Sequence, residues 1–136
     1  MPRLYREAPL NSIWEGSGNV TALDVLRAVS REPDSVDAVF AEIEAASGTD
    51  TWFDRAVREL RTELRGREER RARRLAELLA LCLQGSLLLR YSPSEVSSAF
   101  VSSRFLPDGP WRTAGTLPAE AHARELLERV TPHPRA

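Results

Sequence analysis

The sequence contains no lysine, a single cysteine and no long apolar run. All 19 basic residues are therefore arginines, and 20 acidic residues bring the net charge to −1. Because Cys82 has no partner in the chain, an intrachain disulfide and a zinc-ribbon framework are excluded. The most apolar stretch, residues 75–89, is shorter than the ~20 residues of a membrane span. A polar N-terminus lacks the apolar core of a signal peptide, so we expect a cytoplasmic protein without a membrane partner.

Alternation of apolar and polar residues, the pattern of β-strands, is also missing, and helical periodicity dominates instead. The sequence predicts an all-α bundle of about five to six helices. We expect residues 1–18 to form a loop, residues 19–105 a helical domain, and residues 106–136 a loop, a short helix and a disordered tail. The expected helices cover about 19–30, 33–46, 50–66, 67–90, 93–105 and 119–130.

Several local signals set these boundaries. Thr49 or Asp50 suits the N-cap of the third helix, and Gly66 suits its end. The segment "SPSE", residues 92–95, reads as a capping box with proline at the first helical position. The fourth helix becomes apolar on all sides and is expected at the centre of the bundle, with Cys82 in the core.

Glu15 stands in an unusual setting, between Trp14 and the glycines of "WEGSGN". One interpretation is a polar residue in a surface loop, where glycine serves turn geometry. In the other, an indole and a closed pocket disfavour the charged carboxylate, raise its pKa and create a general base. Composition alone does not choose between them.

The segment "YREAPLNSIWEGSGNVTALDVLR" resembles the part of flavin-dependent acyl-CoA dehydrogenases that holds the catalytic glutamate. Within that superfamily it is most similar to the alkylation-response (AidB-like) branch. "WFDRAVRELRTELR" and "LLLRYSPSEV" are similar to the extra C-terminal helices of the same branch. The resemblance covers about residues 3–105, while residues 106–136 match no pattern that we identify. It implies the C-terminal part of an acyl-CoA dehydrogenase-type fold.

The resemblance also implies roles for individual residues. Glu15 would be the base that removes the α-proton of an acyl thioester, and Trp14 would narrow the acyl pocket. Gly16, Ser17 and Asn19 would contact FAD. Arg27 would be a phosphate contact near the mouth of the site and is therefore also a candidate for binding DNA. An ordinary ion pair with Asp24 explains it equally well.

Most of a flavin site lies in domains that precede this motif in the family. The chain is therefore expected to be inactive alone and to need flavin-bearing acyl-CoA dehydrogenase domains, or other copies in a homo-oligomer, to bind FAD. A helical interaction module without chemistry, self-associating through exposed apolar surface on the first helix, is a further interpretation. His122 and His133 are too far apart in sequence to indicate a metal site.

Residues 54–74 hold nine arginines and five acids. On the predicted helix, the apolar face consists of Phe53, Val57, Leu60 and Leu64. Four of these arginines fall on the opposite face: Arg55, Arg58, Arg61 and Arg65. They would form a surface for weak, non-specific contact with duplex DNA, in keeping with a role in DNA alkylation response. Interleaved acids and a pI near 6.2 favour a solvated face with pairs such as Arg55–Glu59 and Glu63–Arg67.

Overall fold

A computed structural model describes residues 2–14, 16–106, 117 and 121–131 of the chain. Within these ranges the chain is helical and contains no strand, which confirms the predicted all-α class. The elements are α1 (Pro2–Glu7), the 3-10 helix η1 (Ala8–Ser12), α2 (Gly18–Arg31), α3 (Pro33–Glu44), α4 (Thr51–Gly66), the 3-10 helix η2 (Glu69–Arg71), α5 (Ala72–Tyr91), α6 (Ser94–Arg104) and α7 (Ala123–Val130).

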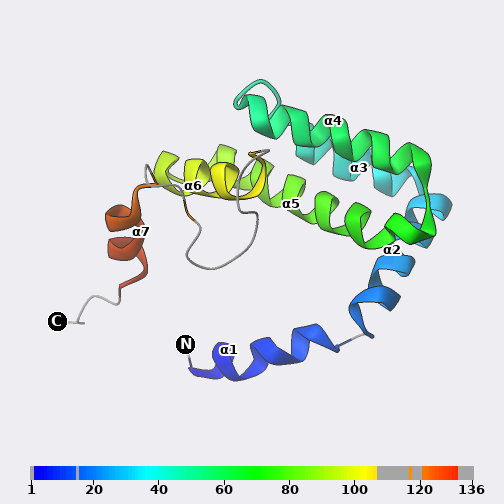
Figure 1. The fold of residues 1–136 in the computed structure, drawn as a ribbon, viewed down its shortest axis with the longest axis horizontal. Helices are drawn as coiled ribbons and strands as arrows, with labels where there is room; N and C mark the ends of the chain where they lie inside the picture. Colours follow the sequence, from blue (N-terminus) through cyan, green and yellow to red (C-terminus); the bar gives the residue numbers. More distant parts are fainter. Residues whose placement is uncertain (1, 15, 107–116, 118–120, 132–136) are drawn as a thin grey trace.

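Helix α5 is the centre of the bundle, as its all-round apolar character predicts. Helices α2, α3, α4 and α6 all pack against it, and Figure 1 shows α3 and α4 together on one side. Leu75, Leu78 and Cys82 are buried along its length. Burial raises the pKa of the Cys82 thiol to about 12, because the apolar surroundings disfavour the thiolate. Cys82 is a core residue, as predicted.

Two small residues let α5 approach its neighbours closely. A Cβ at Gly85 would lie 3.1 Å from the rings of both Phe53 and Phe105, which themselves meet edge to face. One residue later, the buried Ser86 hydroxyl donates a hydrogen bond of 2.7 Å to the carbonyl of Glu42 on α3. This bond satisfies a polar group in the core and ties α3 to α5.

Asp50, one of two residues proposed as the cap, is the N-cap of α4. Its carboxylate accepts hydrogen bonds from the backbone N–H groups of Trp52 and Phe53, at 2.8 and 2.9 Å. Beyond the cap, Phe53 and Leu60 are fully buried, which confirms the predicted apolar face. The helix ends at Gly66, followed by Arg67 in the left-handed region with a φ of +46°.

Four boundary predictions were wrong. The central helix begins at Ala72 and not at residue 67, because the chain turns at Arg67 and then forms the short helix η2. Residues 2–12 form α1 and η1 instead of a loop, because an Arg3–Glu7 pair at i,i+4 spacing supports a first turn that begins with proline. The capping box at residues 92–95 does not form, since the Ser92 hydroxyl donates back to the carbonyl of Leu88 in α5. Helix α7 begins at Ala123 instead of residue 119, and the tail from residue 132 lies outside the described residues.

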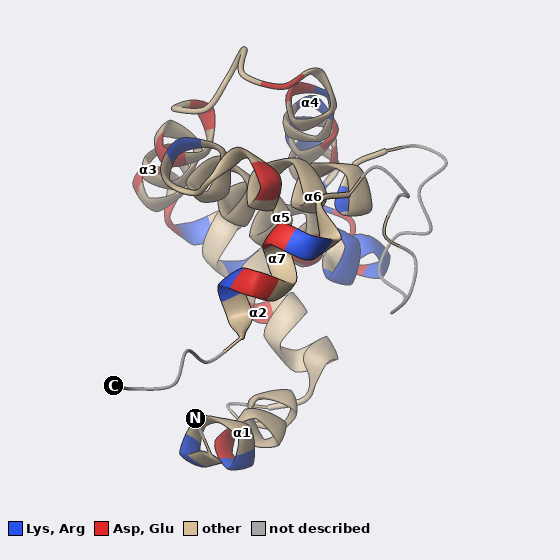
Figure 2. Ribbon diagram, turned by 90° about the vertical axis from the view of Figure 1, so that its left-hand side faces the viewer, with Lys and Arg blue, Asp and Glu red and all other residues tan. Residues whose placement is uncertain are grey.

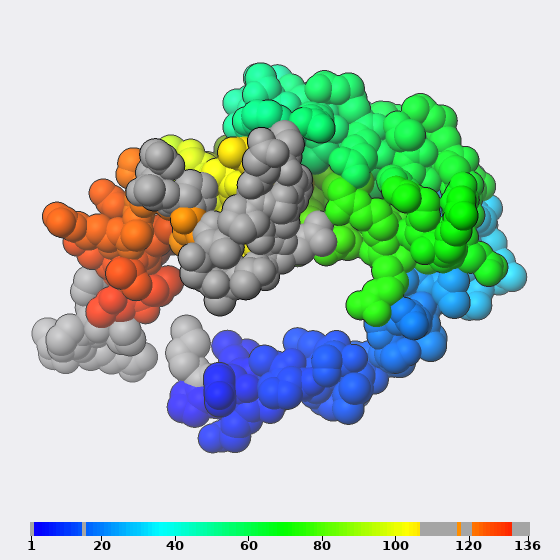
Figure 3. Space-filling model, in the orientation of Figure 1, coloured from blue at the N-terminus to red at the C-terminus, as the bar shows by residue number. Residues whose placement is uncertain are grey.

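The N-terminal segment, residues 2–14, stands apart from the bundle. No residue of α1 or η1 is buried. Figure 3 shows the segment, in dark blue, separated from the other helices by open space over most of its length. Its connection to the bundle is the turn at residues 16–18, where the candidate site lies.

Candidate functional site

The turn that precedes α2 requires glycine at Gly16. Its φ of +118° is rarely adopted by residues that carry a side chain. A Cβ there would also lie 3.1 Å from a methyl group of Val20, on the first turn of the helix. Glu15, the predicted base, lies outside the described residues, so the position of its carboxylate stays a prediction.

Ser17 occupies the N-cap position of α2 without acting as a cap through its side chain. Its backbone is extended, with a φ of −69° and a ψ of 159°, and its hydroxyl makes no capping hydrogen bond. Its carbonyl accepts the 3.0 Å bond from the N–H of Thr21 that starts the helix. The hydroxyl and the first N–H groups of α2 are thus left for other acceptors.

Helix α5 brings Arg73 to this turn from 54 positions along the chain. The guanidinium Nη1 donates a hydrogen bond of 3.2 Å to Oδ1 of Asn19. Its Nη2 lies 3.5 Å from where a Cβ of Gly18 would be. Arg73 was not among the predicted site residues. No motif in the sequence marks Arg73, since it is one of nine arginines in residues 54–74.

Gly16, Gly18 and Arg73 border an open groove of about 470 Å³ beside the N-terminus of α2. Gly16 and Gly18 contribute bare backbone to its wall, and Arg73 contributes positive charge. A helix N-terminus carries partial positive charge, and guanidinium groups bind phosphate oxygens well. The groove therefore offers positive charge and bare backbone to a phosphate-bearing group.

The apolar corner expected around Glu15 is an open surface within the described residues. Trp14 is 61% exposed, and its neighbour Ile13 is 68% exposed. Val20 and Leu23, on the outward face of α2, are also exposed. A closed pocket at Trp14 needs walls that these residues do not supply.

Arg27 forms the ion pair that was one of its two explanations. Its Nη1 lies 2.7 Å from Oδ1 of Asp24 on the same face of α2. Both side chains are exposed, so the pair adds little to stability. The phosphate contact implied by the resemblance stays a prediction.

No protein-family model matches the sequence. The chain is 41% identical over 131 residues to AidB of Escherichia coli (strain K12), an acyl-CoA dehydrogenase-like protein. This match covers 96% of the chain but 23% of that protein, in its C-terminal part. The chain is a relative of the C-terminal portion of AidB.

The AidB-like relationship confirms the family resemblance and corrects its extent. A match over 131 of 136 residues includes most of residues 106–136, for which no resemblance was expected. That segment is rich in proline and carries no distinctive motif, so its similarity is visible only in an alignment. Most of the segment, including Trp111, lies outside the described residues.

The arginines of α4 mainly contact side chains of this chain. Arg61 forms an ion pair with Glu44, and its guanidinium lies 4.6 Å from the ring centre of Phe40. Arg55 lies 5.7 Å from the ring centre of Trp52. Arg65 donates a hydrogen bond of 3.3 Å to Thr62.

The acids between these arginines pair with other elements and not along α4 as expected. Glu59 lies 2.6 Å from Arg74 of α5, and Glu63 pairs with Arg71 of η2. The hydrogen bond from Arg71 lowers the pKa of Glu63 below its ordinary value. Figure 2 shows acidic and basic residues side by side on α4 and α7, and not one sign on a single face. Contact of Arg55, Arg58, Arg61 and Arg65 with DNA stays a prediction, which this arrangement does not favour.

Two further findings concern the described residues alone. Across residues 2–14, 16–106, 117 and 121–131, no three His, Cys, Asp or Glu side chains come close enough together to hold a metal ion. In the same ranges, every helix is too short or too polar to cross a bilayer.

Proposed function

We propose that this chain supplies the active-site glutamate, Glu15, and one wall of the FAD site of an acyl-CoA dehydrogenase-like oxidoreductase. The groove at the start of α2 supports this proposal most directly. It directly follows Glu15 in sequence, has bare glycine backbone and carries Arg73 beside a helix N-terminus. Similarity to AidB supports the proposal further, because the acyl-CoA dehydrogenase family implies a bound FAD in the full-length protein.

The proposed roles follow from the position of each residue. Glu15 takes a proton from the carbon next to the thioester carbonyl, and Trp14 forms part of the acyl pocket. FAD, when bound, supplies the acceptor for the hydride from the neighbouring carbon. Gly16 lets backbone approach the cofactor, while the free hydroxyl of Ser17 and the amide of Asn19 hold its polar groups.

The chain spans about a quarter of the length of the relative it matches. The other walls of the proposed FAD site must therefore come from outside this chain. We assign them to flavin-bearing domains on a longer chain or on a partner copy. Exposed apolar side chains of residues 2–14 support this assignment, because an apolar surface of this kind normally contacts another protein surface. The chain alone is then expected to bind no FAD and to have no dehydrogenase activity.

A chimera tests the proposal. The C-terminal 23% of E. coli AidB is replaced by this chain, and FAD content is measured from flavin absorbance per polypeptide. The chimera is expected to bind FAD, whereas the chain alone is not. A chimera that is folded by circular dichroism but free of FAD would contradict the proposed wall of the flavin site.

Glu15→Gln in the same chimera tests the base. Reduction of the flavin by a panel of acyl-CoA thioesters is expected to slow by about 10²–10⁴-fold, with FAD content unchanged. Glu7→Gln, which removes an exposed carboxylate of α1, is the matched control and should leave the rate unaltered. Equal rates for all three proteins would show that Glu15 is not the base.

A further inference from the structure

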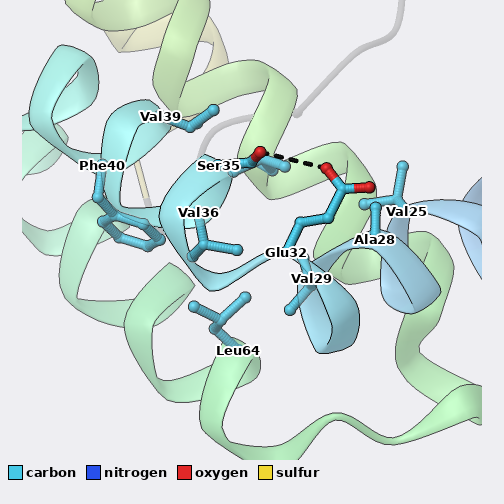
Figure 4. A pocket seen from close by; sticks show the side chains of 10 residues that line it. Val25, Ala28, Val29, Glu32, Ser35, Val36, Val39, Phe40 and Leu64 are labelled. Atoms are coloured by element: carbon cyan, nitrogen blue, oxygen red, sulfur yellow. Dashed lines mark hydrogen bonds between the residues drawn. The ribbon is translucent and has the colours of Figure 1, made fainter.

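A second groove lies between the C-terminal half of α2 and the start of α3, away from the flavin wall. Its volume is about 210 Å³, and its lining is almost entirely apolar. Figure 4 shows the side chains of α2 and α3 around it, with Leu64 of α4 beneath. The main walls are Val25, Ala28, Val36, Val39, Leu64 and Leu79.

The groove exists because two helices diverge from a sharp corner. Glu32 is the only residue between α2 and α3, and its φ of −126° and ψ of 69° turn the chain. Pro33 then starts α3 at once. The facing side chains are mostly valine and alanine, which are too short to fill the space between the helices. Both helices are fixed on α5, so the space does not close.

Polar groups are confined to the rim at this corner. The Ser35 hydroxyl donates a hydrogen bond of 3.2 Å to Oε2 of Glu32, drawn as the dashed line in Figure 4. Since that bond uses the serine proton, the rim offers acceptors to a ligand and no strong donor. Among the described residues, Glu32 forms no ion pair with an arginine. Glu32 carries a negative charge, and none of the residues that line the groove carries a positive one.

We propose that this groove binds a primary alkylammonium ion with a chain of about six to eight carbons. The ammonium group would lie at the Glu32 carboxylate, and the chain would lie between Val36 and Leu64. A cavity of about 150 Å³ holds benzene, so by proportion one of 210 Å³ holds roughly eight carbon atoms. An alkyl carboxylate of equal length would place its charge against Glu32, so the rim selects for a cation. This binding site is separate from the proposed flavin wall and does not depend on it.

Titration of the full chain with butylamine, hexylamine and octylamine at pH 7 tests chain length. Calorimetry is expected to show affinity rising by about fourfold per added CH₂ group up to about eight carbons. Octanol and octanoate then test the charge. Octylamine should bind at least about tenfold more tightly than octanoate, with octanol between them. Equal binding of octylamine and octanoate, or no dependence on chain length, would overturn the proposal.

Two variants locate the binding site. Ala28→Leu fills the groove from an exposed wall position and should abolish octylamine binding. Ala38→Leu adds the same atoms at an exposed position of α3 outside the groove and should leave binding unchanged. Glu32→Gln should bring octylamine to the affinity of octanol, while octanol binding stays the same. Binding that survives Ala28→Leu, or a charge preference that survives Glu32→Gln in a folded variant, would refute the site.

Discussion

Residues 2–14 and the α3–α5 bundle both contain large apolar side chains, but they differ in where these side chains lie. In the bundle, Phe53, Ile43 and Leu60 are completely buried. In the N-terminal segment, Tyr5 is 82% exposed, and Leu4, Leu10, Ile13 and Trp14 are also exposed. Apolar content alone therefore does not separate core from surface. The difference is that the bundle residues have partners on other helices of this chain.

The comparison also separates two sources of helix stability. A six-residue helix such as α1 is unstable in isolation, since helices of fewer than ~12–15 residues are marginal in water. Its local support is an exposed Arg3–Glu7 ion pair. The helices of the bundle are held by tertiary packing on α5. We therefore expect variants of the N-terminal segment to alter assembly and function, and variants of the bundle to alter stability.

Thiol labelling should give the largest contrast between the two regions. In an Ile13→Cys variant the new thiol is exposed, while Cys82 is buried and its pKa is raised to about 12. At pH 8 the exposed thiol has a substantial thiolate fraction, whereas Cys82 reacts only when the bundle opens. A colorimetric thiol reagent should label the first at least about 10³-fold faster. Two equal rates would show that the bundle is no more protected than the segment.

The Cys82 thiol also makes the stability of the bundle depend on pH. The folded pKa of Cys82 lies above its ordinary value of 9.0, so the protonated thiol is favoured in the folded state. Its contribution to stability is complete below pH 9 and is lost as the pH rises from 9 toward 12. Urea unfolding at pH 8 and pH 10.5 should show a loss at high pH that is smaller in Cys82→Ala. An equal loss of stability in the unaltered chain and in Cys82→Ala would show that titrating groups other than Cys82 cause it.

Large-to-small substitutions should give the next largest contrast. Phe53→Ala removes a fully buried ring and should lower the free energy of unfolding by about 3–5 kcal/mol. Trp14→Ala removes an even larger ring that is 61% exposed, and the change should stay within about 0.5 kcal/mol. Urea denaturation followed by far-ultraviolet circular dichroism measures both. A comparable loss for Trp14→Ala would mean that the segment packs on the bundle.

Addition of a methyl group tests the tightness of the bundle from the opposite direction. In Gly85→Ala the new Cβ would lie 3.1 Å from the rings of Phe53 and Phe105, so overpacking should cost about 1–3 kcal/mol. Gly66→Ala is the control, because no atom lies within 4 Å of its new Cβ at the end of α4. That variant should be neutral or more stable in thermal unfolding. Stabilisation by Gly85→Ala would show a looser core than the structure describes.

The bundle could largely be predicted from the sequence, because its determinants are periodic and local. Apolar residues at helical spacing placed Phe53 and Leu60 in the core, and the all-round apolar character of residues 75–89 placed α5 at the centre. Capping was less predictable. Asp50 and Ser92 both fit cap patterns, but the Ser92 hydroxyl has a closer acceptor in the preceding helix at Leu88.

The candidate site was predictable only where it is contiguous in sequence. The glycine turn after Glu15 follows from the motif, and the positive φ of Gly16 agrees with it. Arg73 could not be found in this way, since its contact with Asn19 depends on how the start of α5 meets the start of α2. The groove between α2 and α3 was not predicted, for a similar reason. Its walls come from four helices, and the short side chains that leave it open look like ordinary core residues in sequence.

The smallest contrast compares the N-cap of α4 with that of α2, the helix that follows the N-terminal segment. Asp50→Ala removes both capping hydrogen bonds of α4 and should lower the free energy of unfolding by about 1 kcal/mol. Ser17→Ala removes a hydroxyl that makes no capping bond, so the loss at the start of α2 should be only a few tenths of a kcal/mol. Thermal unfolding of the two variants measures the difference. Equal losses would mean that Ser17 caps α2 in solution and that its hydroxyl is not free for a ligand. If Ser17→Ala is instead neutral in the chain but lowers the FAD content of the AidB chimera, its hydroxyl acts on the cofactor and not on the helix.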